Sequence, residues 1–202
     1  IADLPQRFGE TVNALLDGLF KINSIDTVTI SVHSENFRRL MLALSGDLRV
    51  ILIKIADRLE DMRKIAGLPN DLQLKYANES SFLYAPLAHR LGLYSIKTEL
   101  EDTSLKYLRP VEYEKIEQQL QETVVERQNF VSEFVKPIEE KLLKRNFKFE
   151  MKARTKSIYS IWNKMKKQRV SFEEVYDLFA IRVILDSKPE EEKSDCWQVF
   201  SI

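Results

Sequence analysis

The sequence predicts a protein of two differently built parts: a mainly helical part, then the start of a part that mixes helices and strands. In the first part, apolar residues recur at spacings of three and four, which is typical of amphipathic helices. After Asn146 the period changes to two, because Phe147, Phe149 and Met151 alternate with charged residues. A strand, a helix and a second strand in this order indicate an α+β or α/β domain.

The composition of the 202 residues narrows the possible classes of protein. Hydrophobic residues make up 44% of the chain, enough for a packed core. Lys and Arg balance Asp and Glu at 31 each, so any basic surface must be local. Cys196 is the only cysteine, which excludes an internal disulfide and fits a reducing, cytoplasmic location. No apolar run approaches the roughly 18 residues of a membrane span, so we expect no membrane segment.

The helical part begins with three predicted helices, the first two separated by a loop. The first helix covers residues 1–22, with a possible break at Asp17-Gly18 near its end. Residues 23–33 have the composition of a loop, and Ser34 is a suitable N-cap for a short helix that follows. Helix resumes over residues 48–62, which are apolar on more than one face, so we expect this helix to be central and buried.

Polar residues on this apolar helix need an explanation. Lys54, Asp57, Arg58 and Asp61 fall at i, i+3, i+4 and i+7, so they share one face. One interpretation is a row of ion pairs within the helix. The other is that Asp57 faces a cleft and binds a metal or a phosphate partner, and its apolar neighbours favour this because unpaired buried charge is costly.

Further helices complete the first part. Asn70 or Asp71 is expected to cap the next helix, and another passes through Leu105. His89, which stands alone beside an arginine, is interpreted as a structural residue rather than a ligand. Residues 111–145 form a long amphipathic pattern, and Pro137 should kink or split this helix.

The second part starts with the alternating strand after Asn146. A helix is predicted over residues 157–168 and an apolar strand over residues 178–185. Residues 188–194 form a charged loop, and Asp195 is a possible cap for a last helix.

Basic side chains gather near the start of this second part. Arg154 and Lys156 lie where a strand gives way to a helix, and free backbone N–H groups at such a place also attract anions. Ser160 and Lys164 are four residues apart on the predicted helix and face the same way. Asp177 then opens the next apolar run. Cations suit phosphate oxygens and a carboxylate suits Mg²⁺, so the pattern favours a site for a nucleoside triphosphate and its metal.

The alternative is that the lysines form a solvated helix face and that Asp177 is a turn residue. The chain has no Walker A loop and no G-x-G-x-x-G run, so P-loop and Rossmann sites are excluded. Two isolated histidines and one late cysteine do not support a Ser-His-Asp or Cys-His catalytic set.

Three motifs, in order, resemble the long RelA/SpoT homologues, a family that makes and degrades the alarmones ppGpp and pppGpp. Ile53-Lys-Ile-Ala-Asp-Arg-Leu59 is similar to the second metal-binding motif of the family's HD-type hydrolase. Tyr84-Ala-Pro-Leu-Ala-His-Arg-Leu-Gly92 is similar to the helical segment between its two catalytic domains. Arg154-Thr-Lys-Ser-Ile-Tyr-Ser-Ile-Trp-Asn-Lys-Met165 and Tyr176-Asp-Leu-Phe-Ala-Ile-Arg182 are similar to the opening of its synthetase domain.

The resemblance covers essentially the whole chain and implies a domain organisation. Residues 1–109 would be the later part of a mainly α, HD-type hydrolase domain with the helices that follow it. Residues 110–145 would form linking helices, and residues 146–202 would begin an α+β, nucleotidyltransferase-like synthetase domain. The chain does not start with Met, and the family's remaining ligands are expected before Ile1 and after Ile202. We therefore expect an internal fragment that alone catalyses neither reaction.

By this resemblance, the synthetase transfers pyrophosphate from ATP to the 3′-hydroxyl of GDP or GTP. Arg154 would contact the adenine and Lys156 the ATP phosphates, while Ser160 and Lys164 would help to position phosphate. Asp177 would be a catalytic residue that holds Mg²⁺. Such a transfer relies mainly on positioning and charge neutralisation, which these residue types supply.

The resemblance also exposes departures from the family pattern. Asp57 matches a hydrolase ligand expected to bind Mn²⁺, but Glu60 and Asp61 replace the usual His and Asn. Asp61 occupies a nucleotide-binding position, where a carboxylate would repel the alarmone's phosphates. We therefore expect weak or absent (p)ppGpp hydrolysis. In the synthetase motif, Thr155 and Ser157 replace the usual Pro and His, which affects the fine positioning of the nucleotide.

Two alternatives remain open: a fully bifunctional synthetase/hydrolase, and a helical half that acts as a non-catalytic regulatory scaffold. The expected ligands are ATP, GDP or GTP and (p)ppGpp. The resemblance further implies ribosome contact through regions outside these residues, whereas the sequence does not indicate an oligomeric state.

Overall fold

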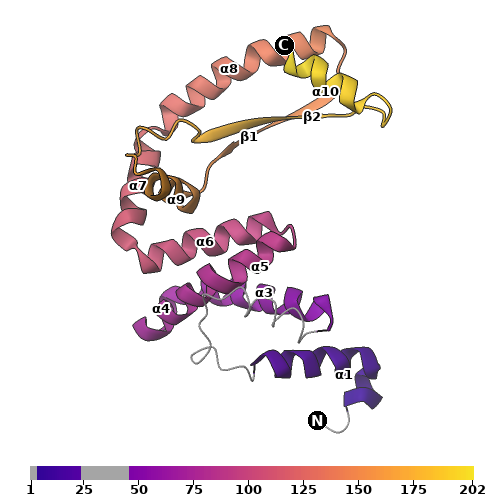
Figure 1. Cartoon of the computed structure of the whole chain (residues 1–202), viewed down its shortest axis with the longest axis vertical. Helices are drawn as coiled ribbons and strands as arrows, with labels where there is room; N and C mark the ends of the chain where they lie inside the picture. Colours follow the sequence, from indigo (N-terminus) through magenta and orange to yellow (C-terminus); the bar gives the residue numbers. More distant parts are fainter. Residues whose placement is uncertain (1–3, 24–45) are drawn as a thin grey trace. The chain divides into compact units, whose positions relative to one another are not determined.

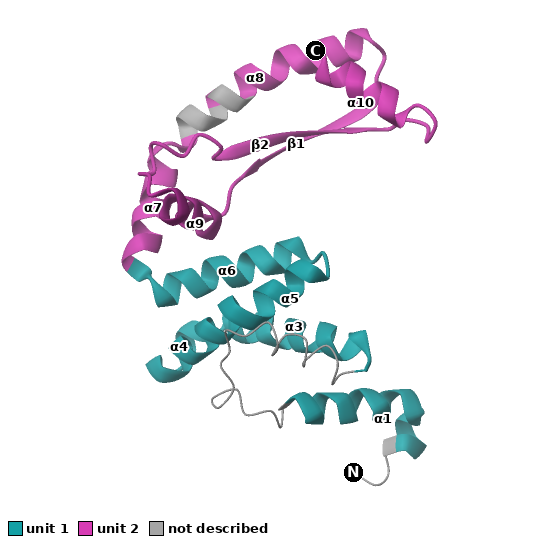
Figure 2. Ribbon diagram, in the orientation of Figure 1, with its two compact units in different colours: residues 1–110 teal, residues 111–202 magenta. Residues whose placement is uncertain are grey.

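The computed structural model describes residues 4–23 and 46–202, with only the backbone described for residues 4, 23, 125–128, 130 and 131. These residues belong to two compact units, residues 1–110 and 111–202 (Figure 2). No helix in the described ranges is long and apolar enough to cross a membrane. The loop and short helix expected between residues 24 and 44 lie outside the described residues.

Unit 1 is built from helices alone in its described part (Figure 1). A 3₁₀ turn (Ile65–Gly67) and a π turn (Ser80–Tyr84) connect some of them. The helices are α1 (Leu4–Asn23), α3 (Leu48–Arg63), α4 (Asn70–Glu79), α5 (Ala85–Arg90) and α6 (Tyr94–Leu108).

The core of unit 1 forms around one face of α3. Ile55 and Met62 of this helix are almost fully buried, together with Leu83 and Leu100 from the helices beside it. Burial of such side chains is the main force that holds the unit together, at about 1.5–3 kcal/mol each. Leu52 and Ile53 of the same helix remain exposed, at 40% and 42%. The prediction that α3 is central and buried is confirmed for the side that carries Ile55 and Met62, whereas its apolar residues Leu52 and Ile53 are exposed.

Helix α1 confirms the first predicted helix, but its break lies elsewhere. The break is at Gly9, whose φ of 81° is open to glycine but strained for other residues. Gly18 continues the helix and packs against α3. A Cβ atom at Gly18 would lie 2.8 Å from Cγ2 of Val50, so this glycine permits close helix packing.

Residues 70–90 form one continuous helical run with a wide turn inside it. Pro86 has no N–H to donate to the carbonyl four residues earlier, and the π turn just before it accommodates this loss. The predicted capping by Asn70 or Asp71 is wrong. Pro69 occupies the N-cap position with no capping side chain, so Asn70 and Asp71 already lie within the first turn.

Unit 2 combines helices with a two-stranded sheet, which confirms the predicted change of fold class. The long helical pattern divides at Thr123, whose hydroxyl donates to the carbonyl of Gln119, and not at Pro137, which stays inside a helix. The elements are α7 (Pro110–Glu122), α8 (Val124–Lys144), β1 (Phe149–Thr155), α9 (Ile158–Gln168), β2 (Phe179–Leu185) and α10 (Glu192–Phe200).

Strands β1 and β2 are antiparallel, with Phe149 opposite Leu185 and Thr155 opposite Phe179. Helix α8 runs along the sheet, while α9 lies beside α7 at one end of the unit (Figure 1). The last helix begins earlier than predicted, after Glu191. Asp195 does not cap it but accepts a hydrogen bond from Ser187 at 2.6 Å.

Candidate functional site

The junction between β1 and α9 places several predicted site residues close together. Only Lys156 and Ser157 separate the strand from the helix. The backbone N–H of Lys156 donates to the carbonyl of Leu178 at 2.7 Å, so the junction is tied to the segment just before β2. This bond brings the loop that carries Asp177 to the start of α9.

Asp177 lies between two lysines from different elements. Lys156 contacts one carboxylate oxygen of Asp177, and Lys164 of α9 contacts the other. The hydrogen bonds from Lys156 and then Lys164 lower the pKa of Asp177 to about 2. The carboxylate is therefore ionised at neutral pH and held as a charged group.

This cluster of three charges is open to solvent. The side chain of Asp177 is 53% exposed, and those of Lys156 and Lys164 are 26% and 27% exposed. Ion pairs in such positions contribute only about 0–1 kcal/mol each. A ligand with stronger charges can therefore replace these contacts without unfolding the site.

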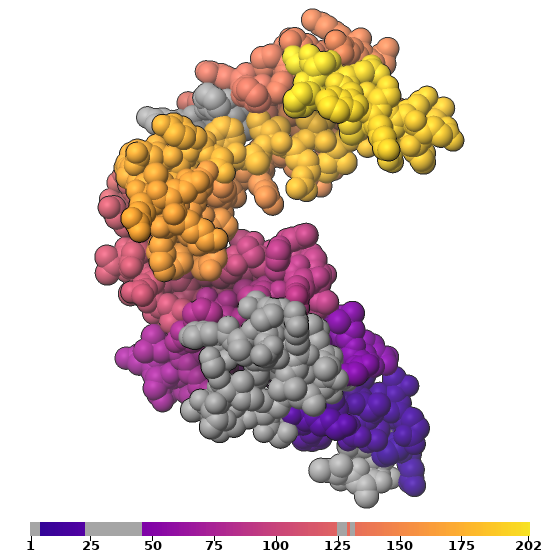
Figure 3. Space-filling model, viewed as in Figure 1, coloured from indigo at the N-terminus to yellow at the C-terminus, as the bar shows by residue number. Residues whose placement is uncertain are grey.

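Packing beneath the cluster fixes the path of the loop between α9 and β2. Phe172 and Val175 of this loop are buried, and Phe172 packs with Ile116 of α7 and Ile161 of α9. The space-filling view shows α9 and this loop, in orange, as one packed group (Figure 3). Val175 lies two residues before Asp177, so this packing fixes where the loop presents Asp177. Phe172 and Val175 are apolar residues within a loop, which could have indicated from the sequence that the loop is packed, but they belong to no recognised motif.

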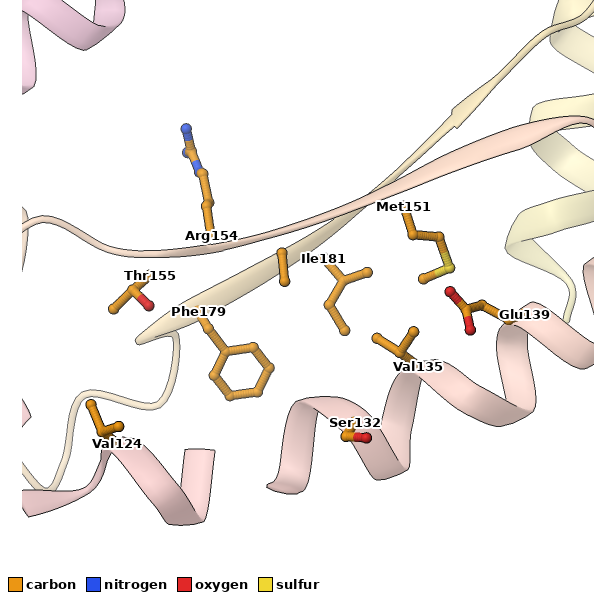
Figure 4. Close-up of a pocket in the computed structure, with 10 residues that line it drawn as sticks. Val124, Ser132, Val135, Glu139, Met151, Arg154, Thr155, Phe179 and Ile181 are labelled. Carbon is orange, nitrogen blue, oxygen red and sulfur yellow. The ribbon is translucent and has the colours of Figure 1, made fainter. Parts of the chain in front are cut away.

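Ser160 and Arg154 reach the same region from the helix and from the strand. The hydroxyl of Ser160 lies one helical turn before Lys164 and contacts the hydroxyl of Ser157 at 2.9 Å. Arg154 projects from the side of the strands opposite α8, whereas Phe179 points toward α8 (Figure 4). The structure thus brings Lys156, Lys164 and Asp177 into contact, with Ser160 and Arg154 on the adjoining helix and strand.

A second arginine shares the sheet face of Arg154. Residues two apart along a strand, and residues directly opposite in an antiparallel pair, point to the same side. Lys152 lies opposite Arg182 in the register, so both share the outer face with Arg154. Arg182 was not among the site residues predicted from the sequence. The alternation over residues 178–185 shows which residues of that strand share a side with Arg182. Only the pairing of β1 with β2 shows that this is also the side of Arg154.

The inner face of the sheet borders a groove of about 390 Å³ beside α8. Met151, Phe179 and Ile181 point from the strands toward this helix (Figure 4). The groove is mainly apolar, and although Arg154 borders it, the Arg154 side chain points to the other side of the strands (Figure 4). The groove is therefore not the site of the predicted phosphate contacts.

The polar residues of α3 in unit 1 separate into two environments. Lys54 and Asp57 form an ion pair at 2.9 Å, in which the side chain of Asp57 is 59% exposed and that of Lys54 only 17%. Glu60 pairs with Lys64 on the surface, and Asp61 is half-buried. The expected apolar surroundings of Asp57 are wrong, because Asp57 is exposed and Ile53, one turn before it on the same side, is exposed as well.

Arg58 turns inward instead of joining this row. Its guanidinium donates to Glu79 at 2.6 Å and lies 4.3 Å and 4.6 Å from the ring centres of Tyr76 and Tyr84. Arg58 and Glu79 are both buried. The predicted common face therefore holds a surface ion pair and, separately, a buried structural one. His89 is exposed and packs edge-on against Tyr94.

The two implied metals fit the described residues differently. Asp177 alone suits Mg²⁺, which keeps most of its waters and binds through one or two carboxylates plus substrate phosphates. Within residues 4–23 and 46–202, no group of three or more His, Cys, Asp and Glu residues could hold a metal. Asp57 therefore has no partner ligands for Mn²⁺ in the described part of the chain.

Family models match both parts of the chain. Residues 1–94 match the HD domain, and residues 153–202 match the region found in RelA / SpoT proteins. The helical unit and the start of the mixed unit thus define a chain that combines an HD domain with a RelA/SpoT region.

Several curated proteins are similar over nearly the whole chain. A guanosine-3′,5′-bis(diphosphate) 3′-pyrophosphohydrolase of Aquifex aeolicus is 38% identical over 99% of the chain, which covers 28% of that protein. GTP pyrophosphokinases of Myxococcus xanthus and Escherichia coli are 37% and 36% identical over 93% and 98% of the chain, covering 25% and 27% of those proteins. The chain belongs to the RelA/SpoT family, and it spans about a quarter of the length of these relatives.

Proposed function

We propose that the protein containing this chain acts in (p)ppGpp metabolism and transfers pyrophosphate from ATP to the 3′-hydroxyl of GDP or GTP. The observation that carries this proposal is the convergence of Lys156, Lys164 and Asp177 at the start of α9. Two cations and one ionised carboxylate form a set that can take phosphate oxygens and a divalent metal together. The names of the similar proteins support the same chemistry.

In this reaction the 3′-hydroxyl of the acceptor loses its proton to water as its oxygen bonds to the β-phosphorus of ATP. The bond from that phosphorus to the oxygen of the α-phosphate breaks, and AMP leaves. Lys156 and Lys164 would exchange Asp177 for phosphate oxygens, and Ser160 would donate a hydrogen bond to phosphate. Bound Mg²⁺ would neutralise charge on the transferred group. Asp177, released from the lysines, is the carboxylate that would hold it. Arg154 and Arg182 share a sheet face, where guanidinium groups can stack on a base.

The test uses the protein encoded by the complete reading frame that contains this chain. Incubation with labelled ATP, GDP and Mg²⁺ should yield labelled ppGpp, with AMP in equal amount. Asp177→Asn should reduce this yield by at least a hundredfold while the protein stays folded. Equal yields from the Asp177→Asn variant would contradict the role of Asp177, and no product from folded wild type would contradict the function.

For the hydrolase half, we propose weak or absent activity, based on Glu60 and Asp61. Both carboxylates lie on the helix turns around Asp57, where negative charge repels an alarmone's phosphates. Labelled ppGpp with Mn²⁺ should release little pyrophosphate, and Glu60→His combined with Asp61→Asn should raise the rate. Rapid release by wild type that is lost in Asp57→Ala would instead indicate a bifunctional enzyme.

The regulatory-scaffold alternative concerns the same half. It predicts that disrupting α7 and α8 abolishes regulation of ppGpp synthesis while ATP binding stays intact. We further propose that residues 1–109 and 146–202 are parts of the hydrolase and synthetase domains, with residues 110–145 linking them.

A further inference from the structure

Two serine hydroxyls meet at the start of α9. Ser157 occupies the N-cap position with an extended backbone, and its Oγ accepts a hydrogen bond from the backbone N–H of Ser160 at 3.2 Å. The same hydroxyl donates to Oγ of Ser160 at 2.9 Å. Both side chains are half-buried, so water competes less for these contacts than on an open surface.

We propose that Ser157 is a positioning residue for the nucleotide and acts through the hydroxyl of Ser160. This inference rests on the proposed function, in which Ser160 contacts phosphate. A phosphate oxygen offers only lone pairs, so Ser160 must donate its proton to it. The lone pairs of Ser160 are then left to accept the proton of Ser157. The resulting chain runs from the N–H of Ser160 through Ser157 and Ser160 to the phosphate.

This arrangement has two chemical consequences. Ser157 holds the Ser160 hydroxyl in one rotamer with its proton directed outward, so less rotational entropy is lost when the nucleotide binds. Hydrogen bonds in a chain also polarise one another, which strengthens the last donation to a charged acceptor. Capping alone requires neither effect, because a cap needs only an acceptor at Oγ.

The choice of substitution separates capping from positioning. Glycine is a tolerated N-cap that lowers helix stability by only a few tenths of a kcal/mol, yet it has no hydroxyl. Ser157→Gly therefore removes the contact to Ser160 while α9 stays formed. Ser157→Thr keeps a hydroxyl at the same position. Asp47 caps α3 in unit 1 through its contact with the N–H of Arg49, so Asp47→Gly is a matched loss of a cap away from α9.

The experiment measures KM for ATP, kcat, and the dissociation constant of a non-hydrolysable ATP analogue, with the protein from the complete reading frame. Ser157→Gly should raise both KM and the dissociation constant about tenfold, with kcat changed less than twofold. Ser157→Thr should restore most of the affinity, and Asp47→Gly should leave it within twofold. In a Ser160→Ala background, Ser157→Gly should add less than a twofold effect, because the group through which it acts is gone.

Two results would overturn the inference: unchanged affinity in Ser157→Gly, or the same tenfold loss in the Ser160→Ala background as in wild type. The second would mean that Ser157 acts through the helix and not through Ser160. If wild type binds the analogue and the variants give either of these results, this inference alone is refuted. Folded wild type that neither binds the analogue nor forms product refutes the proposed function as well.

Discussion

Two clusters of charged residues in this chain use the same chemistry in opposite environments. In unit 1, Arg58 and Glu79 pair inside the core, between the rings of Tyr76 and Tyr84. In unit 2, Asp177 pairs with lysines on the surface, at a loop held in place by buried residues beneath it.

Burial decides what each cluster can do. A buried pair that loses one partner leaves a charge without compensation, so it cannot exchange partners at a modest cost. An exposed pair is weak and can be exchanged for a more highly charged ligand. The first cluster therefore holds α3 to α4, and the second is available for phosphate. Spacing in the sequence does not separate these two cases.

The largest expected effect comes from removing Glu79. Glu79→Leu leaves the Arg58 guanidinium buried without its carboxylate partner, so we expect a loss of about 3–5 kcal/mol in the free energy of unfolding. Glu99→Leu is the matched control, because Glu99 pairs with Arg63 on the surface and should contribute about 0–1 kcal/mol. Urea unfolding of both variants measures the difference, and equal losses would show that burial does not distinguish the pairs.

In unit 2 the expected effect is on activity. Lys156→Met should lower the rate of ppGpp synthesis by about 10²–10³-fold, as expected for loss of one charge-stabilising group, while stability changes by less than about 1 kcal/mol. Lys166→Met is the control, since Lys166 lies over the ring of Trp162 at 5.0 Å. A similar loss of activity in both variants would indicate a general effect of charge and not a specific contact.

A smaller effect is expected in the titration of Asp177. Its pKa of about 2 should rise toward the usual 3.8 in Lys156→Met, because the hydrogen bond from Lys156 is the largest cause of the lowering. Because the pKa is lowered on folding, the ion pairs stabilise the protein fully above about pH 3.8 and are lost as the pH falls through about 2. Carboxyl ¹³C chemical shifts follow this midpoint, and an unchanged midpoint would exclude the Lys156 contact in solution.

The smallest effect belongs to the surface pair of α3. Lys54→Met removes the partner of Asp57, and exposed pairs spaced along a helix contribute about 0.3–0.5 kcal/mol. We expect a change in unfolding free energy within about 0.5 kcal/mol, measured by urea unfolding. A loss of several kcal/mol would mean that Lys54 and Asp57 belong with the buried cluster.

Periodicity in the sequence predicted most of the elements. The alternation from Phe147 to Met151 predicted β1, and the apolar spacing after Ser157 predicted α9, whereas the capping role of Ser157 was not predicted. Helix breaks that were predicted from a single residue were less reliable. Pro137 did not divide the long helix and Gly18 did not break α1, because the surrounding packing and helix length outweighed the local preference of one residue.

For the site, the sequence predicted which residues are chemically suitable but not their contacts. Asp177 meets both lysines only because Phe172 and Val175 fix the path of the loop before it. The sequence motifs around Lys156, Lys164 and Asp177 do not indicate the path of this loop. The burial of the Arg58 side chain could not be predicted from spacing either, because its partner Glu79 lies on another helix.

The outer face of the sheet adds a consequence for dynamics. Lys152 lies directly opposite Arg182, an arrangement of like charges that weakens a strand pair. Glu150 relieves part of this repulsion through its ion pair with Lys152 at 3.2 Å. The β1–β2 ribbon should therefore fray readily at this pair, and its amide hydrogens should exchange more slowly when one of the two charges is removed, as in Lys152→Thr.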